Sequence, residues 1–301
     1  MSVEFCGLRL AHPIINGSGT FDAIAARAAF GEALATAFPF SAYVSKTITL
    51  QPRTGNPPPR LWEAPSGLVN SIGLPNKGLE GYIAEDLPQL TGFRSDPSAS
   101  PEGTSEPVLL ITNVMGSTGE ELGRLVEACD AQAGIAAIEL NVSCPNVATG
   151  LDIGADPVQL ESVVKVVRER TGKPLIVKLT PNAADVPGCA QAAEAGGADA
   201  VSLINTLRAM ALAPGSGATG SARRWLGGGT GGLSGPAIRP VALAQVSAVS
   251  GRVGIPVIGM GGVQRPAHAR DMLAAGARLV AVGTESFRDP AAGTRIAQGL
   301  L

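Results

Sequence analysis

The sequence predicts an α/β protein, a single-domain (β/α)8 barrel of the TIM type, and three observations favour it. Eight short apolar runs alternate with helical segments along the 301 residues. The runs are almost continuously apolar, as strands of a parallel sheet buried on both faces are. Several helical segments begin with proline at the first helical position, as Pro157 and Pro236 do. Strand followed by helix, eight times over, favours a closed parallel barrel over an open sheet.

The expected strands are short, and most are followed by a longer helical segment. The strands are 13–19, 43–48, 108–114, 137–143, 175–180, 200–206, 256–261 and 279–284. The helices are 21–35, 77–90, 120–133, 157–170, 186–195, 236–250 and 266–275, and a short last helix is expected at 290–301. Two connections are long, near 49–76 and 207–235, and such loops are usually lids or binding loops. A polar segment near 92–106 is expected to be a solvated insertion on the opposite face, without a catalytic role.

The composition favours a small-molecule partner. The net charge is -2, and the chain has no run rich in Lys and Arg that would bind nucleic acid or anionic lipid. Neither a targeting segment nor a stretch of about 18 uninterrupted apolar residues is evident, so we expect a cytoplasmic protein that does not bind membranes. The four cysteines form no C-x-x-C pair, and we expect neither a metal site nor an iron–sulfur cluster in this chain.

Cys144 is the candidate catalytic base. It lies within the run 141–146 (NVSCPN), just past an expected strand, and barrels of this type build their sites on the loops that follow the strands. The only two histidines, His12 and His268, do not lie beside a strand end of this kind, which leaves a thiolate as the natural proton acceptor. The other three cysteines have apolar surroundings and are expected to be small buried hydrophobic residues.

Two of the five lysines, Lys46 and Lys178, are expected to interrupt strands that are otherwise buried. A buried ammonium group is costly unless an anion pairs with it. Both residues therefore predict an anionic ligand, or a cofactor that becomes anionic. Pairing with a core carboxylate is the alternative interpretation, and Glu139 is the only acid within the expected strand cores.

Glycine clusters at 259–263 and 282–284 follow the last two strands, where barrels of this type commonly bind phosphate. Turn geometry alone would also explain them. A third cluster, 227–232, contains G-x-G-x-x-G, but no clear strand precedes it and no acid follows about 20 residues later, so we do not interpret it as a dinucleotide site. A phosphate site, a lysine and a thiol at one barrel mouth are best explained by FMN.

These residues resemble those of class 1 dihydroorotate dehydrogenases over essentially the whole chain. The matching stretches are 13–19 (PIINGSG), 53–59 (RTGNPPP), 70–76 (NSIGLPN), 139–146 (ELNVSCPN), 177–182 (VKLTPN), 204–207 (INTL), 231–243 (GGLSGPAIRPVAL), 259–263 (GMGGV) and 281–284 (AVGT). The combination of INTL, TGGLSGPAI and GMGGV is similar to the class 1B catalytic subunit rather than to the fumarate-using class 1A homodimer.

The resemblance implies oxidation of (S)-dihydroorotate to orotate in de novo pyrimidine (UMP) biosynthesis, with the hydride passing to FMN and the proton to Cys144. The FMN contacts that it implies are Ser18, Lys46, Thr47, Asn113, Asn141, Lys178, Ile204, Gly235, Gly261, Gly262, Gly283 and Thr284. The substrate contacts that it implies are Lys46, Asn70, Ser71, Ile72, Gly73, Leu74, Asn141, Asn205 and Thr206. It also implies a homodimer, or a heterotetramer with a second subunit that carries FAD and a [2Fe-2S] cluster and passes electrons to NAD.

Two other functions remain open on the sequence. The barrel of dihydropyrimidine dehydrogenase is similar and also uses a cysteine, and Lys46 discriminates only partly because it could serve a substrate carboxylate or the flavin. A phosphate-binding barrel without redox chemistry, acting as an isomerase or a ligand-binding module, is the third interpretation.

Overall fold

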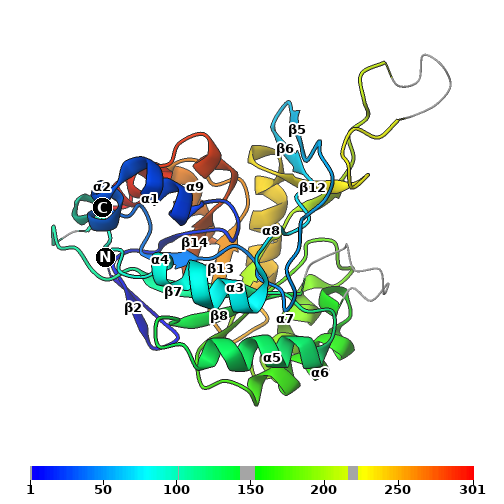
Figure 1. The fold of residues 1–301 in the computed structure, drawn as a ribbon, viewed down its shortest axis with the longest axis horizontal. Helices are drawn as coiled ribbons and strands as arrows, with labels where there is room; N and C mark the ends of the chain where they lie inside the picture. The colour runs from blue at the N-terminus through cyan, green and yellow to red at the C-terminus, as the bar shows by residue number, and fades with distance from the viewer. Residues whose placement is uncertain (1, 101, 143–152, 216–222) are drawn as a thin grey trace.

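The computed structural model describes residues 2–100, 102–142, 153–215 and 223–301. The barrel strands are β3 (Ile14–Asn16), β4 (Ala42–Val44), β7 (Leu109–Val114), β8 (Ala137–Asn141), β9 (Leu175–Lys178), β10 (Ala200–Leu203), β13 (Val257–Met260) and β14 (Leu279–Val282). In the described part of the chain they form an eight-stranded sheet in the order β3-β14-β13-β10-β9-β8-β7-β4. Its paired strands are all parallel. The predicted (β/α)8 barrel is confirmed (Figure 1).

The helices follow the strands much as the sequence predicts. They are α1 (Ala23–Phe30), α2 (Glu32–Thr36), α3 (Gly78–Gly81), the π-helical turn η1 (Tyr82–Asp86), α4 (Leu87–Leu90), α5 (Gly119–Asp130), α6 (Pro157–Arg168), α7 (Val186–Ala195), α8 (Arg239–Ser250), α9 (Pro266–Ala274) and α10 (Ala292–Gln298). Short 3-10 turns in the described ranges are η2 (Pro97–Ala99), η3 (Ile153–Ala155), η4 (Pro236–Ile238) and η5 (Thr284–Phe287). The single helix expected at 21–35 is divided at Gly31, which has a φ of 61°.

An N-terminal hairpin packs against the barrel interior at the end where the strands begin. It consists of β1 (Val3–Phe5) and β2 (Leu8–Leu10), joined through Cys6 and Gly7, both of which have positive φ as a two-residue hairpin turn requires. Phe5 and Leu10 are each 2% exposed and belong to the same apolar cluster as the inward-facing strand residues. The N-terminal end of the barrel is therefore filled by hydrocarbon.

The seam between β3 and β4 is held by a side chain. The buried amide of Asn16 donates to the Val44 carbonyl and accepts from the Val44 N–H, both at 2.8 Å. The carboxamide thus repeats the hydrogen-bond pattern of a backbone pair. Ser41 N–H adds a bond to the Ile14 carbonyl at 3.1 Å. These contacts bring the first and last strands of the sheet order together.

The two long connections contain a second sheet that the sequence does not reveal. Among the described residues, β5 (Leu61–Ala64), β6 (Gly67–Asn70), β11 (Leu207–Ala209) and β12 (Gly231–Ser234) form a four-stranded antiparallel sheet in the order β11-β12-β6-β5. Strands β5, β6 and β12 stand out from the barrel (Figure 1). Glycine is required where strands approach closely, because a Cβ on Gly232 would lie 1.9 Å from Thr206 Oγ1. The long connections expected at 49–76 and 207–235 therefore contain short strands as well as loops.

The segment near 92–106, which the sequence predicts to be a solvated insertion, also contributes buried residues. Phe93, Ser95 and Ala99 are all buried, and the Phe93 ring lies 4.7 Å from the Phe38 ring. Ser95 N–H also donates to the Glu106 carbonyl at 2.8 Å. The segment is polar in composition, but burial of its single aromatic residue, Phe93, packs this part of the chain against the protein.

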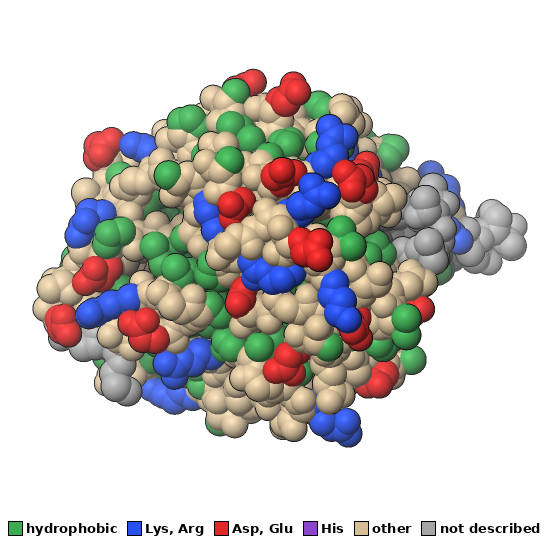
Figure 2. All heavy atoms as spheres, turned by 90° about the horizontal axis from the view of Figure 1, so that it is seen from below, with side chains coloured by type: hydrophobic (Ala, Val, Ile, Leu, Met, Phe, Trp, Pro, Cys, Tyr) green, Lys and Arg blue, Asp and Glu red, His purple; other side chains and the backbone are tan. Residues whose placement is uncertain are grey.

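The outer surface carries charges of both signs. Figure 2 shows Lys and Arg side chains interspersed with Asp and Glu over the face that it draws. None of the helices described by the structure has the length and apolar character needed to cross a lipid bilayer.

Candidate active site

The parallel strands bring the predicted cofactor residues to one end of the barrel. Asn113, Asn141 and Lys178 lie at or near the ends of β7, β8 and β9. Ser18, Thr47, Ile204, Gly261 and Gly283 lie just past the ends of five other strands. Because C-terminal ends of parallel strands share one face of a barrel, these residues surround one mouth. The C-terminal end of the barrel, where these residues lie, is called the barrel mouth below.

Buried polar side chains cluster on three adjacent strands of the mouth. Asn113 is fully buried, while Asn141 and Lys178 are 7% and 6% exposed. Asn141 and Lys178 are direct neighbours in the β8–β9 register. Asn141 also donates through Nδ2 to Thr47 Oγ1 at 3.3 Å, which links the end of β8 to the segment after β4.

A buried carboxylate accepts hydrogen bonds next to this cluster, on the side of the barrel interior. Glu139 on β8 accepts from Asn113 Nδ2 at 2.5 Å and from Ser202 Oγ at 2.6 Å. Its role is therefore to orient neighbouring side chains. Sequence analysis identified Glu139 as the only acid in the strand cores, but it did not identify these two partners.

The remaining amide oxygen of Asn113 is an unused acceptor. Asn113 Oδ1 is buried and has no hydrogen-bond partner within the described ranges. A buried polar group left unsatisfied typically costs about 1–3 kcal/mol. A ligand N–H placed against this oxygen would remove that cost.

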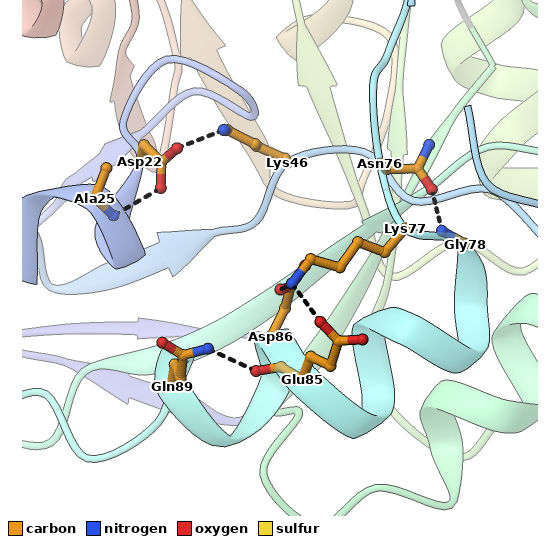
Figure 3. A network of polar contacts seen from close by, with 9 residues as sticks. All are labelled: Asp22, Ala25, Lys46, Asn76, Lys77, Gly78, Glu85, Asp86 and Gln89. Atoms are coloured by element: carbon orange, nitrogen blue, oxygen red, sulfur yellow. Dashed lines mark hydrogen bonds and ion pairs between the residues drawn. The ribbon is translucent and has the colours of Figure 1, made fainter. Parts of the chain in front are cut away.

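Lys46 differs from the prediction. It lies two residues past the end of β4, its side chain is 52% exposed, and its ammonium group contacts Asp22 Oδ2 at 2.5 Å. Figure 3 shows the lysine directed toward the start of α1. The expectation that Lys46 interrupts a buried strand and requires a ligand anion is wrong, because the strand ends earlier and a nearby carboxylate supplies the charge.

Asp22 is a residue that sequence analysis missed. Its Oδ1 accepts from Ala25 N–H at 3.0 Å and caps α1, while the lysine holds its pKa below the usual value. An Asp before an alanine-rich segment is a recognisable helix N-cap. That signal predicts where the helix begins, but not the ion pair with a lysine 24 residues later in the chain.

The glycine clusters converge beside the end of β12. Gly235 has a φ of 94°, and a Cβ placed on it would lie 2.9 Å from Gly67 Cα and 3.6 Å from Thr284 Cγ2. A Cβ on Gly262, which has a φ of 69°, would lie 2.8 Å from the Gly235 carbonyl oxygen. Thr284 Oγ1 and Ser234 Oγ are 2.8 Å apart. Backbone from after β12, β13 and β14 is thus closely packed, and Gly235 and Gly262 leave no room for a side chain.

The predicted substrate residues are joined by the second sheet. Asn70 ends β6, where it pairs with Gly232 of β12 and donates to its carbonyl at 3.2 Å. Thr206 precedes β11 and accepts at its carbonyl from Asn182 Nδ2 at 3.1 Å, while its N–H donates to Asn205 Oδ1 at 2.8 Å. Residues far apart in sequence therefore lie side by side.

The segment after β6 has an unusual backbone. Leu74 has a φ of 57°, which is uncommon outside glycine, and Asn76 Nδ2 donates to its carbonyl at 2.9 Å. Ser71 is buried and accepts from Asn56 Nδ2 at 2.9 Å, and Asn56 N–H donates to the Ile72 carbonyl at 3.0 Å. The run that includes Gly73 is therefore held in a defined shape.

A cavity of about 300 Å³ lies beside the Lys46–Asp22 ion pair. Its walls include Asp22, Lys46, Phe30, Phe287 and the buried Ser286. Among the predicted site residues that the structure describes, only Lys46 lines it. The cavity therefore adjoins the predicted site without coinciding with it.

Cys6, Cys129 and the two histidines are poor candidates for a base at the barrel mouth. Burial raises the pKa of both Cys6 and Cys129 to about 12. Burial lowers the pKa of His12 to about 4, and this side chain lies before β3, at the strand-start end of the barrel. His268 is on α9, outside the barrel strands. The predicted base, Cys144, lies outside the described residues.

The chain matches known proteins along its whole length. A family model described as dihydroorotate dehydrogenase matches residues 1–301. A protein of Geobacter sp. (strain M21), named dihydroorotate dehydrogenase B (NAD(+)), catalytic subunit, is 42% identical over 299 residues, which are 99% of this chain and 91% of the relative. Proteins with the same name from Desulforudis audaxviator and Citrifermentans bemidjiense are also 42% identical, over 303 and 302 residues, with the same coverage of each chain.

Proposed function

Because this chain belongs to the dihydroorotate dehydrogenase family, we propose that it oxidises (S)-dihydroorotate to orotate in pyrimidine biosynthesis. The observation that carries the proposal is 42% identity over 99% of the chain to proteins named as the B-type, NAD(+)-linked catalytic subunit. The resemblance found in the sequence is thereby confirmed at the level of the family and of class 1B. The polar barrel mouth supplies groups suited to this chemistry.

Membership of this family implies a flavin cofactor, and we propose that it is FMN. Three features of the mouth suit a phosphorylated flavin. The unused Asn113 Oδ1 suits a ring N–H, and Lys178 suits the negative charge of a reduced ring. The glycine-rich backbone around Gly235, Gly262 and Thr284 has positive φ at both glycines, and the N–H groups of such turns can bind a phosphate.

The remaining proposed FMN contacts surround these three features. They are Ser18, Lys46, Thr47, Asn141, Ile204, Gly261 and Gly283. Ser18 Oγ donates to the Ser45 carbonyl at 2.8 Å, and Ile204 N–H donates to the Met260 carbonyl at 3.0 Å. These bonds fix the backbone on which a cofactor would rest.

The bound flavin would supply a hydride acceptor for C6 of the substrate. Cys144 would remove the proton from C5, acting as its thiolate. An unperturbed thiol has a pKa of about 8.5, so the thiolate fraction, and with it the rate of oxidation, should rise as the pH increases toward that value. Lys178 would stabilise the charge that develops on the cofactor side.

The substrate would be oriented by amide and hydroxyl groups. Asn70, Asn141, Asn205 and Thr206 provide donors and acceptors for a planar ring that bears alternating N–H and C=O groups. The run 71–74 would form one wall. Lys46 would bind the carboxylate of the substrate, which requires its ammonium group to be shared with or released by Asp22.

The names of the relatives imply a partner subunit that transfers electrons. We propose that this partner carries FAD and a [2Fe-2S] cluster and delivers electrons to NAD. A heterotetramer built on a homodimer of this chain would fit that arrangement. Co-purification from the native source would test it, because a second, cysteine-rich and coloured chain is expected in the complex.

Turnover of dihydroorotate against dihydrouracil tests the proposed substrate. The FMN-loaded protein is assayed with each compound and an artificial electron acceptor. A strong preference for dihydroorotate is expected, because only this compound offers a carboxylate to Lys46. A preference for dihydrouracil would contradict the proposal and favour an enzyme similar to dihydropyrimidine dehydrogenase.

A further inference from the structure

Asp22 uses its two carboxylate oxygens for different purposes. Oδ1 accepts from Ala25 N–H at 3.0 Å and caps α1. Oδ2 contacts Lys46 Nζ at 2.5 Å. Figure 3 shows the carboxylate between the helix start and the lysine. One acid thus connects a structural element to the cation that is proposed to bind the substrate.

The two partners differ in how firmly they are held. The helix-cap bond of Asp22 uses the other oxygen, so it does not depend on the contact with the lysine. The backbone at Lys46 is fixed by its neighbour Ser45, whose hydroxyl accepts from Asn113 N–H and donates to the Lys46 carbonyl, both at 3.0 Å. The lysine stem has four rotatable carbons, and its side chain is 52% exposed. The ammonium group can therefore move while the carboxylate stays in place.

We propose that Asp22 is an internal counter-anion that competes with the substrate carboxylate for Lys46 and so sets the affinity for anionic pyrimidines. This inference rests on the proposed function. An arriving carboxylate meets a neutral ion pair instead of a free cation, and it must draw the ammonium group away from Asp22. A pyrimidine ring without a carboxylate does not need to bind the ammonium group of Lys46, so its affinity should not depend on Asp22.

The expected effect is modest because the ion pair is half-exposed. Exposed pairs are weakly coupled, and release of Lys46 from its competitor should tighten orotate binding by about two- to fivefold. Salt screens exposed charges, so the difference should shrink at about 1 M ionic strength. Binding of uracil, which lacks the carboxylate, should be unchanged.

The test measures orotate binding to the FMN-loaded protein through the change in flavin absorbance. Asp22→Asn and Asp22→Ser remove the charge and keep a side chain that can cap α1. Glu161→Gln is the matched control, because Glu161 forms an equally short exposed pair with Lys165, at 2.5 Å, on α6. We expect the Kd for orotate to be two- to fivefold lower in both Asp22 variants and unchanged in the Glu161→Gln control.

Unchanged or weaker orotate binding in both Asp22 variants, with wild-type binding intact, would overturn this inference alone. Weaker binding would show that Asp22 positions Lys46 for the substrate instead of competing with it. A wild-type protein that holds FMN but binds no orotate would overturn the proposed function, and this inference with it.

Discussion

The two ends of the barrel differ in the side chains that the same eight strands place there. At the N-terminal end, Phe5 and Leu10 of the first hairpin pack against apolar inward-facing residues. At the C-terminal end, the strands finish in buried polar groups such as Asn113 and Lys178. The difference indicates that apolar burial is concentrated at the closed end, while the mouth carries buried polar groups, of which Asn113 Oδ1 has no hydrogen-bond partner among the described residues.

Magnitudes support this division. Burying a large apolar side chain typically contributes about 1.5–3 kcal/mol, so each residue of the hairpin that enters the core is a net gain. An unsatisfied buried acceptor such as Asn113 Oδ1 typically costs about 1–3 kcal/mol. The burial of one apolar residue of the hairpin is thus of the same size as the cost of this unsatisfied acceptor.

The largest expected effect is at the mouth. Cys144→Ser should slow reduction of the flavin by dihydroorotate by roughly 10²- to 10⁴-fold at neutral pH, because a thiol is partly deprotonated at this pH and a serine hydroxyl is not. Stopped-flow single-turnover reduction measures it. A reduction rate equal to that of the wild type would show that another group takes the proton. The unfolding midpoint of the variant is the control and should equal that of the wild type.

Phe5→Ala tests the opposite end. It should lower the free energy of unfolding by about 3–5 kcal/mol, because a buried ring is removed from a packed cluster. Urea unfolding measures the loss, and flavin reduction in the folded fraction should proceed at the wild-type rate. A slower reduction without loss of stability would break the proposed separation of the two ends.

The pH dependence of stability provides a third test at the closed end. Burial lowers the pKa of His12 from its usual 6.5 to about 4, so the folded state favours the neutral ring. The stabilisation is present above pH 6.5 and is lost as the pH falls toward about 4, and it amounts to about 3 kcal/mol. Urea unfolding at a series of pH values should show this loss. In His12→Gln the corresponding part of the slope should be absent, and an identical slope in both proteins would contradict the assignment.

The smallest effect in this comparison concerns cofactor affinity. Lys178→Ala should weaken FMN binding by about 10- to 100-fold, because one charge-assisted contact at the mouth is lost. The FMN content after dialysis and the flavin reduction potential measure the change. Lys165→Ala, on the exposed face of α6, is the matched control and should retain the cofactor. Full retention with an unchanged potential in Lys178→Ala would assign this lysine a different role.

The pattern of apolar residues predicts the strands and helices, which are determined by neighbouring residues in the sequence. The eight strand positions and most helices were confirmed, because near-continuous apolar runs and proline at helix starts depend on neighbouring residues. The seam at Asn16 was not predicted, since a carboxamide that replaces backbone hydrogen bonds has no sequence signal. The second sheet was also missed, because its glycines are required by contacts between strands that are far apart in sequence.

The candidate site shows the same limit. Most of the predicted residues do lie at or just past strand ends, because apolar runs indicate where strands end, while their roles in binding stay predictions. Lys46 was misplaced because the strand stops at Val44, and its charge partner Asp22 comes from a different element. The role of Cys144 remains a prediction.

Anaerobic mixing of the purified, FMN-loaded protein with dihydroorotate tests the central claim most directly. The account predicts one FMN per chain, bleaching of the flavin absorbance band, and one orotate formed for each flavin reduced. A colourless protein that takes up no FMN, or a flavin that stays oxidised in the presence of dihydroorotate, would contradict it.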